Sequence, residues 1–149
     1  MDGGVAVVIA NRDIFNTDRG NIRGGKNMIR NGVDLSRGIV DLVNDGILVN
    51  LTQHPINIIL DGTTLTIAPS GTVARVDCVR DQIADGIVTT KYLNTTDLPD
   101  QVRGRLLIVS ALVRLAAPDR DDLVGPDSGP VGSVRDADGR IIGVRGITF

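Results

Sequence analysis

Between Leu106 and Ala117, in the sequence LLIVSALVRLAA, only Ser110 and Arg114 interrupt a continuous apolar run, the longest in the chain. A run of this kind predicts a buried element around which the rest of the molecule packs. Its first half is typical of a strand. Residues 111–117 fit either a continuation of that strand or a two-turn helix capped by Ser110, because periodicity does not separate the two in so short a segment.

From residue 47 onward, short apolar segments alternate with turn signals. Asp-Gly pairs at 61–62, 85–86 and 138–139 each indicate a tight turn between two strands. The segments between residues 47 and 80 suggest a meander of neighbouring strands. About seven or eight short strands at intervals of roughly 10 residues predict a mainly β fold: a small antiparallel barrel or sandwich with one or two short helices.

Residues 1–46 have a different pattern. Residues 11–32 hold isolated apolar side chains among Arg, Asn, Asp and Gly, so they cannot bury enough surface to fold alone. Residues 33–46 fit a short amphipathic helix that begins after Asp34 or Ser36 and ends at Gly46. The chain is therefore predicted to consist of an extended N-terminal arm, residues 1–46, and a β domain, residues 47–149.

The arm also holds its own basic patch, which two aspartates dilute. This mixture favours contact with protein over contact with nucleic acid. The residues predicted to make the assembly contacts are Arg19, Arg23, Lys26 and Arg30.

Composition supports a protein of strands and turns. All 18 acidic residues are Asp, which favours caps and turns, and only two of the 16 basic residues are Lys. A genomic codon bias is the alternative explanation for this excess of Asp and scarcity of Lys. The net charge of −2 creates no long-range field that would draw the chain to nucleic acid, and no apolar run approaches the length of a membrane span.

Catalytic and metal-binding motifs are not found. His54 is the only histidine and is interpreted as a turn residue before Pro55, since it lacks the partners of a triad or a zinc site. Ser110 lacks the G-x-S-x-G context of a nucleophile elbow. Cys78 is expected to be a small buried or half-buried apolar residue. We expect no enzyme activity, no metal and no cofactor.

The Asp-rich segment after Pro118 could supply oxygen ligands to a hard cation, but its spacing matches no Ca²⁺ loop. We interpret it as a solvated loop whose aspartates form ion pairs with Arg120. The carboxylates concerned are Asp119, Asp121, Asp122 and Asp127.

Six segments carry a resemblance to a known family: NLTQHPINI, APSGTVARV, TTKY, LLIVSALV, RDDLVGPDSGPV and VRDADGRIIGV. From Val49 to the C-terminus, about two-thirds of its length, the chain resembles a small family encoded by tailed phages and by bacteria that carry prophages. That family brings no established catalytic residues. The first 46 residues lie outside the resemblance.

Together these features predict a non-enzymatic phage structural protein, such as a capsid decoration or other virion accessory protein. Its partners would be its own copies, the major capsid protein or both, and it would be found in the virion or in the host cytoplasm before assembly. The alternative is a small phage binding protein that sequesters a nucleotide or signalling molecule. Its donors for phosphate would be His54, Arg75, Lys91, Tyr92 and Arg114.

Overall fold

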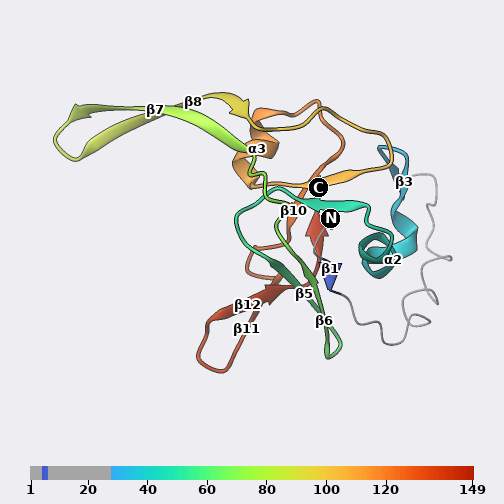
Figure 1. Ribbon diagram of the computed structural model, residues 1–149. Helices are drawn as coiled ribbons and strands as arrows, with labels where there is room; N and C mark the ends of the chain where they lie inside the picture. Colours follow the sequence, from blue (N-terminus) through green and yellow to red (C-terminus); the bar gives the residue numbers. More distant parts are fainter. Residues whose placement is uncertain (1–4, 7–27) are drawn as a thin grey trace.

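The computed structural model describes residues 5–6 and 28–149 (Figure 1). The helical segments within these described residues are the 3-10 helix η3 (Leu35–Arg37), α2 (Gly38–Asn44) and α3 (Ala111–Ala116). The strands are β1 (Val5–Ala6), β2 (Ile29–Arg30), β3 (Val33–Asp34), β4 (Leu48–Asn50), β5 (Ile56–Leu60), β6 (Thr63–Ile67), β7 (Arg75–Ala84), β8 (Ile87–Thr96), β9 (Leu106–Ile108), β10 (Leu123–Pro126), β11 (Ser133–Arg135), β12 (Ile141–Val144) and β13 (Ile147–Thr148).

The prediction of a mainly β protein with one or two short helices is confirmed, and two short α-helices are present among the described residues. One sheet has the strand order β1-β6-β5-β12-β11 and a second has the order β13-β10-β9-β4, while β2–β3 and β7–β8 form separate two-stranded ribbons. The pairing differs from the purely antiparallel expectation, because β4 with β9, β9 with β10, and β12 with β5 are parallel. Both larger sheets are open, and the described strands form no closed barrel.

The two larger sheets are held together by one apolar core, which gives a sandwich-like arrangement. Side chains from β5, β6 and β12 meet side chains from β4, β9 and β10 in the same buried cluster. Strand β9 is buried on both faces: Leu106 and Ile108 belong to this cluster, whereas Leu107 and Val109 belong to a second one on the opposite side. This alternation confirms the prediction that the apolar run is the centre of the fold.

The second half of the apolar run is a helix. Ser110 has extended backbone angles and its hydroxyl oxygen accepts from the Val113 amide at 3.4 Å, which caps the start of α3. Helix α3 crosses from β9 to the parallel strand β10 and buries Val113 in the second cluster. Of the two alternatives for residues 111–117, the helix is therefore correct, and Ser110 marks the junction.

Residues 28–46, assigned from the sequence to the arm, pack into the body. Val33, Val40, Leu42 and Val43 belong to the main core cluster together with residues of both larger sheets. The short helix of the arm is α2, and it runs from Gly38 to Asn44. Residues 33–43 of the predicted arm thus contribute side chains to the core of the β domain.

Two local interactions order this segment. The Asp34 carboxylate accepts hydrogen bonds from the hydroxyl and the amide of Ser36, which lowers the pKa of Asp34 and caps η3. The buried Asn31 amide donates to the carbonyls of Val102 and Arg105 at 2.9 and 2.7 Å. These contacts join the β2–β3 turn to a loop about 70 residues further along the chain.

All three Asp-Gly pairs are turns between antiparallel strands, as predicted. They join β5 to β6, β7 to β8, and β11 to β12. The predicted meander is wrong, however. Strand β4 pairs with β9 rather than with β5, and β7 leaves the body to pair with β8 alone.

Candidate functional site

Two features outside the core could carry function, and the first is the β7–β8 hairpin. Among the described strands, its two 10-residue strands pair only with each other, and they project away from the body with α3 near their root (Figure 1). At about 3.3 Å per residue, each strand is roughly 33 Å long. Beyond its root, every residue of the hairpin from Asp77 to Asn94 is exposed.

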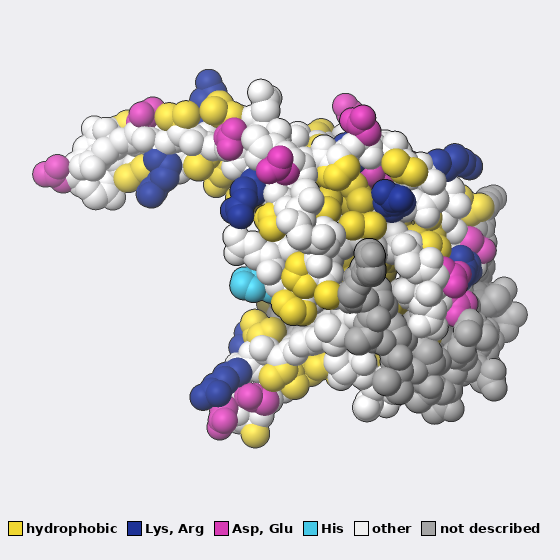
Figure 2. All heavy atoms as spheres, viewed as in Figure 1, with side chains coloured by type: hydrophobic (Ala, Val, Ile, Leu, Met, Phe, Trp, Pro, Cys, Tyr) yellow, Lys and Arg dark blue, Asp and Glu magenta, His cyan; other side chains and the backbone are white. Residues whose placement is uncertain are grey.

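The hairpin exposes apolar side chains on both faces. Register pairs Val79 with Lys91 and Cys78 with Tyr92, so alternation places Val79 and Lys91 on one face and Tyr92 on the other. Figure 2 shows apolar side chains interspersed with basic and acidic ones along its length. The large apolar residues and their exposed fractions are Val79 44%, Ile83 64%, Ile87 53%, Val88 41%, Tyr92 51% and Leu93 44%.

Cys78 lies on this hairpin and is exposed, so the expectation of a buried or half-buried residue is wrong. The physical reason is the pairing of β7. Had β7 joined a meander beside β6, one of its faces would have been buried against the core.

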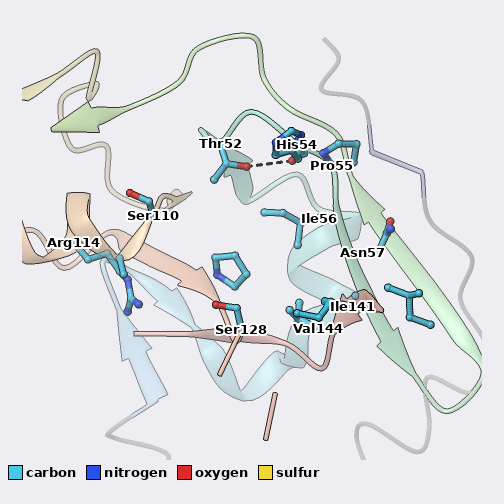
Figure 3. A pocket seen from close by; sticks show the side chains of 14 residues that line it. Thr52, His54, Pro55, Ile56, Asn57, Ser110, Arg114, Ser128, Ile141 and Val144 are labelled. Atoms are coloured by element: carbon cyan, nitrogen blue, oxygen red, sulfur yellow. Dashed lines mark hydrogen bonds between the residues drawn. The ribbon is translucent and has the colours of Figure 1, made fainter. Parts of the chain in front are cut away.

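The second feature is a cavity of about 550 Å³ that is open to solvent at the surface of the body. It is bordered by the loop before β5, by α3, by the end of β10 and by β12 (Figure 3). All of its lining residues except Arg114 come from four of the segments that carry the family resemblance, namely NLTQHPINI, LLIVSALV, RDDLVGPDSGPV and VRDADGRIIGV. In Figure 3, Ser110, Arg114 and Ser128 lie on one side of the cavity and Asn57 lies on the opposite side.

A buried asparagine holds the loop at the mouth of the cavity. Asn50 is 1% exposed, and its amide donates to the His54 carbonyl at 2.8 Å and to the Ile67 carbonyl at 3.0 Å. Its side-chain oxygen accepts from the amide and the hydroxyl of Thr52. These bonds fix the turn that carries His54, whose interpretation as a turn residue before Pro55 agrees with the structure.

Arg114 reaches the cavity from α3, and β10 is shaped to receive it. A Cβ at Gly125 would lie only 3.0 to 3.2 Å from Nε, Cζ and Nη2 of Arg114, so the guanidinium packs closely against this glycine and would have to shift if a side chain were added. Arg114 Nε is buried without a hydrogen-bond partner. Among the described residues, no carboxylate forms an ion pair with Arg114.

The five predicted ligand donors do not all meet. His54 and Arg114 line the cavity. Arg75 borders an adjoining depression of about 320 Å³ that shares Thr52, His54 and Ser110 with the first. Lys91 and Tyr92 lie on the hairpin and line neither hollow.

Of the four basic residues predicted to make assembly contacts, only Arg30 lies within the described part of the chain. Arg19, Arg23 and Lys26 lie outside the described residues. Arg30 contacts its own body: Nε donates to the Asp121 carbonyl at 3.1 Å, and the guanidinium lies 4.3 Å from the centre of the Phe149 ring. Arg30 therefore anchors β2 to the C-terminus.

The Asp-rich loop is an ion-paired structural element. Arg120 binds both carboxylate oxygens of Asp122 at 2.8 Å, and this hydrogen bonding raises the pKa of Arg120. The predicted pairing with Arg120 is thus present, although Asp122 is 1% exposed rather than solvated. Within the described ranges, no three His, Cys or Asp side chains gather closely enough to hold a metal ion.

Sequence reasoning missed Asn57 and Ser128 at the cavity and the full length of the hairpin. No pattern in the sequence singles out Asn57 or Ser128. The hairpin had a signal, because the apolar residues of β7 and β8 flank an Asp-Gly turn. Its isolation from the other sheets depends on tertiary pairing, which local patterns do not contain.

No protein-family model, curated protein or solved structure matches this chain. None of the helices in the described ranges is long and apolar enough to span a membrane.

Proposed function

We propose that this protein is a non-enzymatic structural protein that assembles from its own copies, with the β7–β8 hairpin as the contact element. The observation that carries the proposal is the exposed apolar surface of this hairpin. Extended elements that leave the body with most of their apolar side chains exposed are suited to contacts between subunits.

A free hairpin of this kind is poorly stabilised. An isolated two-stranded ribbon is marginally stable in water, because it has no hydrophobic face to pack against. Complete burial of a Val, Ile or Leu side chain contributes about 1.5–3 kcal/mol. Six large apolar residues of the hairpin are at least 41% exposed, so contact with a partner would recover much of this free energy.

A second copy of the chain is the partner that the hairpin fits. Its two outer edges are unpaired among the described strands, so each can add a strand from another subunit. The ribbon carries three basic residues, Arg75, Arg80 and Lys91, and three acidic ones, Asp77, Asp81 and Asp85. Antiparallel pairing about a twofold axis places Asp85 at the tip of one copy near Arg75 at the root of the other, which is a self-complementary arrangement.

The test is the mass of the protein in solution by size-exclusion chromatography with light scattering. The full chain should have a multiple of its 15.8 kDa mass. Replacing residues 79–91 with Asn-Gly, which closes the register at Cys78 and Tyr92, should give a folded monomer.

A single charged residue should have the same effect as the truncation. Ile87→Lys in the hairpin should dissociate the assembly. Val131→Lys, at a position that is 85% exposed in another loop, should not. A full chain that is monomeric at high concentration, or a truncated chain that still assembles, would contradict the proposal.

The place of assembly is a second part of the proposal: a phage particle, in which the protein acts as a capsid decoration or other virion accessory protein. It is supported by the six segments that resemble the phage and prophage family. Mass spectrometry of purified particles should find the protein in a fixed ratio to the major capsid protein. Its absence from washed particles would refute the virion role and leave self-assembly standing.

A further inference from the structure

We propose that the cavity between β5, β12 and α3 binds a small organic anion, in which a phosphate or carboxylate group is attached to a partly apolar body. Arg114 pairs with the anionic group. This site is separate from the hairpin and does not depend on the assembly proposed above.

The size of the cavity suits a small molecule. Its volume of about 550 Å³ lies within the range of roughly 300–1,000 Å³ that is usual for ligand pockets. Most of its wall is apolar, and a few polar groups from separate elements converge on it. This combination is typical of sites that bury the body of a ligand and orient it by a small number of hydrogen bonds.

The charge of the cavity selects an anion. Arg114 lines it, and none of the lining residues is an aspartate. Because the buried Nε of Arg114 has no partner and no described carboxylate pairs with the side chain, the guanidinium keeps donors for a ligand. A planar guanidinium binds phosphate and carboxylate with charge-assisted hydrogen bonds.

Two hydroxyl groups lie on the same side of the cavity as Arg114 (Figure 3). The Ser110 oxygen accepts from the Val113 amide, which leaves its own O–H able to donate. The Ser128 hydroxyl makes no hydrogen bond with any residue in the described part of the chain. The two serines and Arg114 therefore form a group of donors for the oxygens of one anion.

The rest of the cavity fits an organic body. Ile56, Ile141 and Val144 lie between the Arg114 side and the Asn57 side (Figure 3). Asn57 accepts from the Thr66 hydroxyl at 2.8 Å, so its amide hydrogens can donate to a polar group at the far end of the ligand.

Isothermal titration calorimetry of the full chain tests the site with four probes: adenosine 5′-monophosphate, adenosine, octanoate and inorganic phosphate. Saturable binding of the nucleotide without binding of adenosine identifies a phosphate ester as the ligand. Saturable binding of octanoate identifies a carboxylate. Inorganic phosphate should bind more weakly than the preferred organic anion, because it leaves the apolar part of the cavity empty.

Two variants and a matched control test the role of Arg114. Arg114→Gln should weaken binding of the preferred probe by about tenfold or more, since it removes a charge-assisted contact. Gly125→Ala keeps the charge and displaces the guanidinium, so it should also weaken binding. Arg105→Gln removes an exposed positive charge that does not line the cavity and should leave affinity unchanged.

Thermal melting of each variant shows that it is folded, and the chain lacking residues 79–91 should bind as the full chain does. Binding by the truncated chain would show that the ligand site does not require the hairpin proposed for assembly. The proposal is overturned if no probe binds with a dissociation constant below about 1 mM, or if Arg114→Gln binds as tightly as Arg105→Gln.

Discussion

Two Asp-Gly hairpins in this protein begin from the same local signal and end in opposite environments. In β5–β6, Asp61 and Gly62 both have positive φ, at 37° and 81°, and the turn joins two five-residue strands. In β7–β8, Gly86 has a φ of 77° and the strands are twice as long. Both hairpins are antiparallel and both carry Val, Ile or Leu.

What differs is the neighbourhood of each ribbon. Strands β5 and β6 lie between β12 and β1, and Ile58, Leu65 and Ile67 are at most 1% exposed. Strands β7 and β8 pair with no other strand in the described part of the chain, and most of their apolar residues are exposed to solvent. A turn signal thus specifies a hairpin, whereas the sheet that the hairpin joins decides whether its apolar residues stabilise this chain or a contact with another.

Hydrogen exchange should show the largest contrast between the two hairpins. In dilute monomer, the β5–β6 amides should exchange only through global unfolding, which costs about 5–15 kcal/mol in domains of this kind. The β7–β8 amides should exchange by local opening, orders of magnitude faster. Mass spectrometry of peptic fragments at two protein concentrations measures both.

Assembly adds a second expectation to this experiment. At the higher concentration, protection should increase in β7–β8 and stay constant in β5–β6. Equal protection of the two hairpins in dilute monomer would remove the contrast on which the assembly proposal rests.

Truncation of one apolar side chain in each hairpin should give the next largest difference. Leu65→Ala in β6 removes a side chain that is 0% exposed and should lower the free energy of unfolding by about 2–5 kcal/mol. Ile87→Ala in β8 removes a side chain that is 53% exposed, and it should change the free energy of unfolding of the monomer by less than about 0.5 kcal/mol. Urea unfolding followed by circular dichroism measures both, and a large loss for Ile87→Ala would mean that the hairpin packs on its own body.

Local features of the fold were readable from the sequence. The three Asp-Gly turns, the buried Leu106–Val109 run and the Ser110 cap all depend on neighbouring residues, and each is present. Asn31-Gly32 has the same kind of signal: both residues have positive φ, at 50° and 79°, and they turn β2 into β3 inside the segment assigned to the arm. Structure in that segment was therefore also foreseeable.

Features that join distant segments were not readable. Leu48 pairs in parallel with Leu106, and nothing near either residue specifies this partner across 57 intervening positions. The cavity is likewise formed by segments that lie far apart in the sequence. The residue types of His54 and Arg114 indicate donors for a ligand, but only the tertiary structure brings them together with Ser128 and Asn57. Lys91 is a donor of the same kind, but it lies on the β7–β8 hairpin.

The smallest expected effect comes from the two turn glycines, which form a matched pair. Neither Gly62 nor Gly86 has an atom within 4 Å of an added Cβ, so alanine at either position acts only through its backbone conformation. Left-handed backbone costs a residue with a Cβ roughly 1–2 kcal/mol. Gly62→Ala should lower the global free energy of unfolding by about 1 kcal/mol, because β5–β6 unfolds with the core.

Gly86→Ala carries the same strain in a ribbon that opens on its own. Since the strain can be released by fraying of β7–β8 without unfolding the body, the global midpoint in urea should not move, and only exchange in the hairpin should accelerate. Equal shifts of the midpoint for the two variants would mean that the projecting hairpin and the body unfold as one unit. The exposed apolar residues of the hairpin would then be part of a single cooperative structure rather than a separate element available to a second copy.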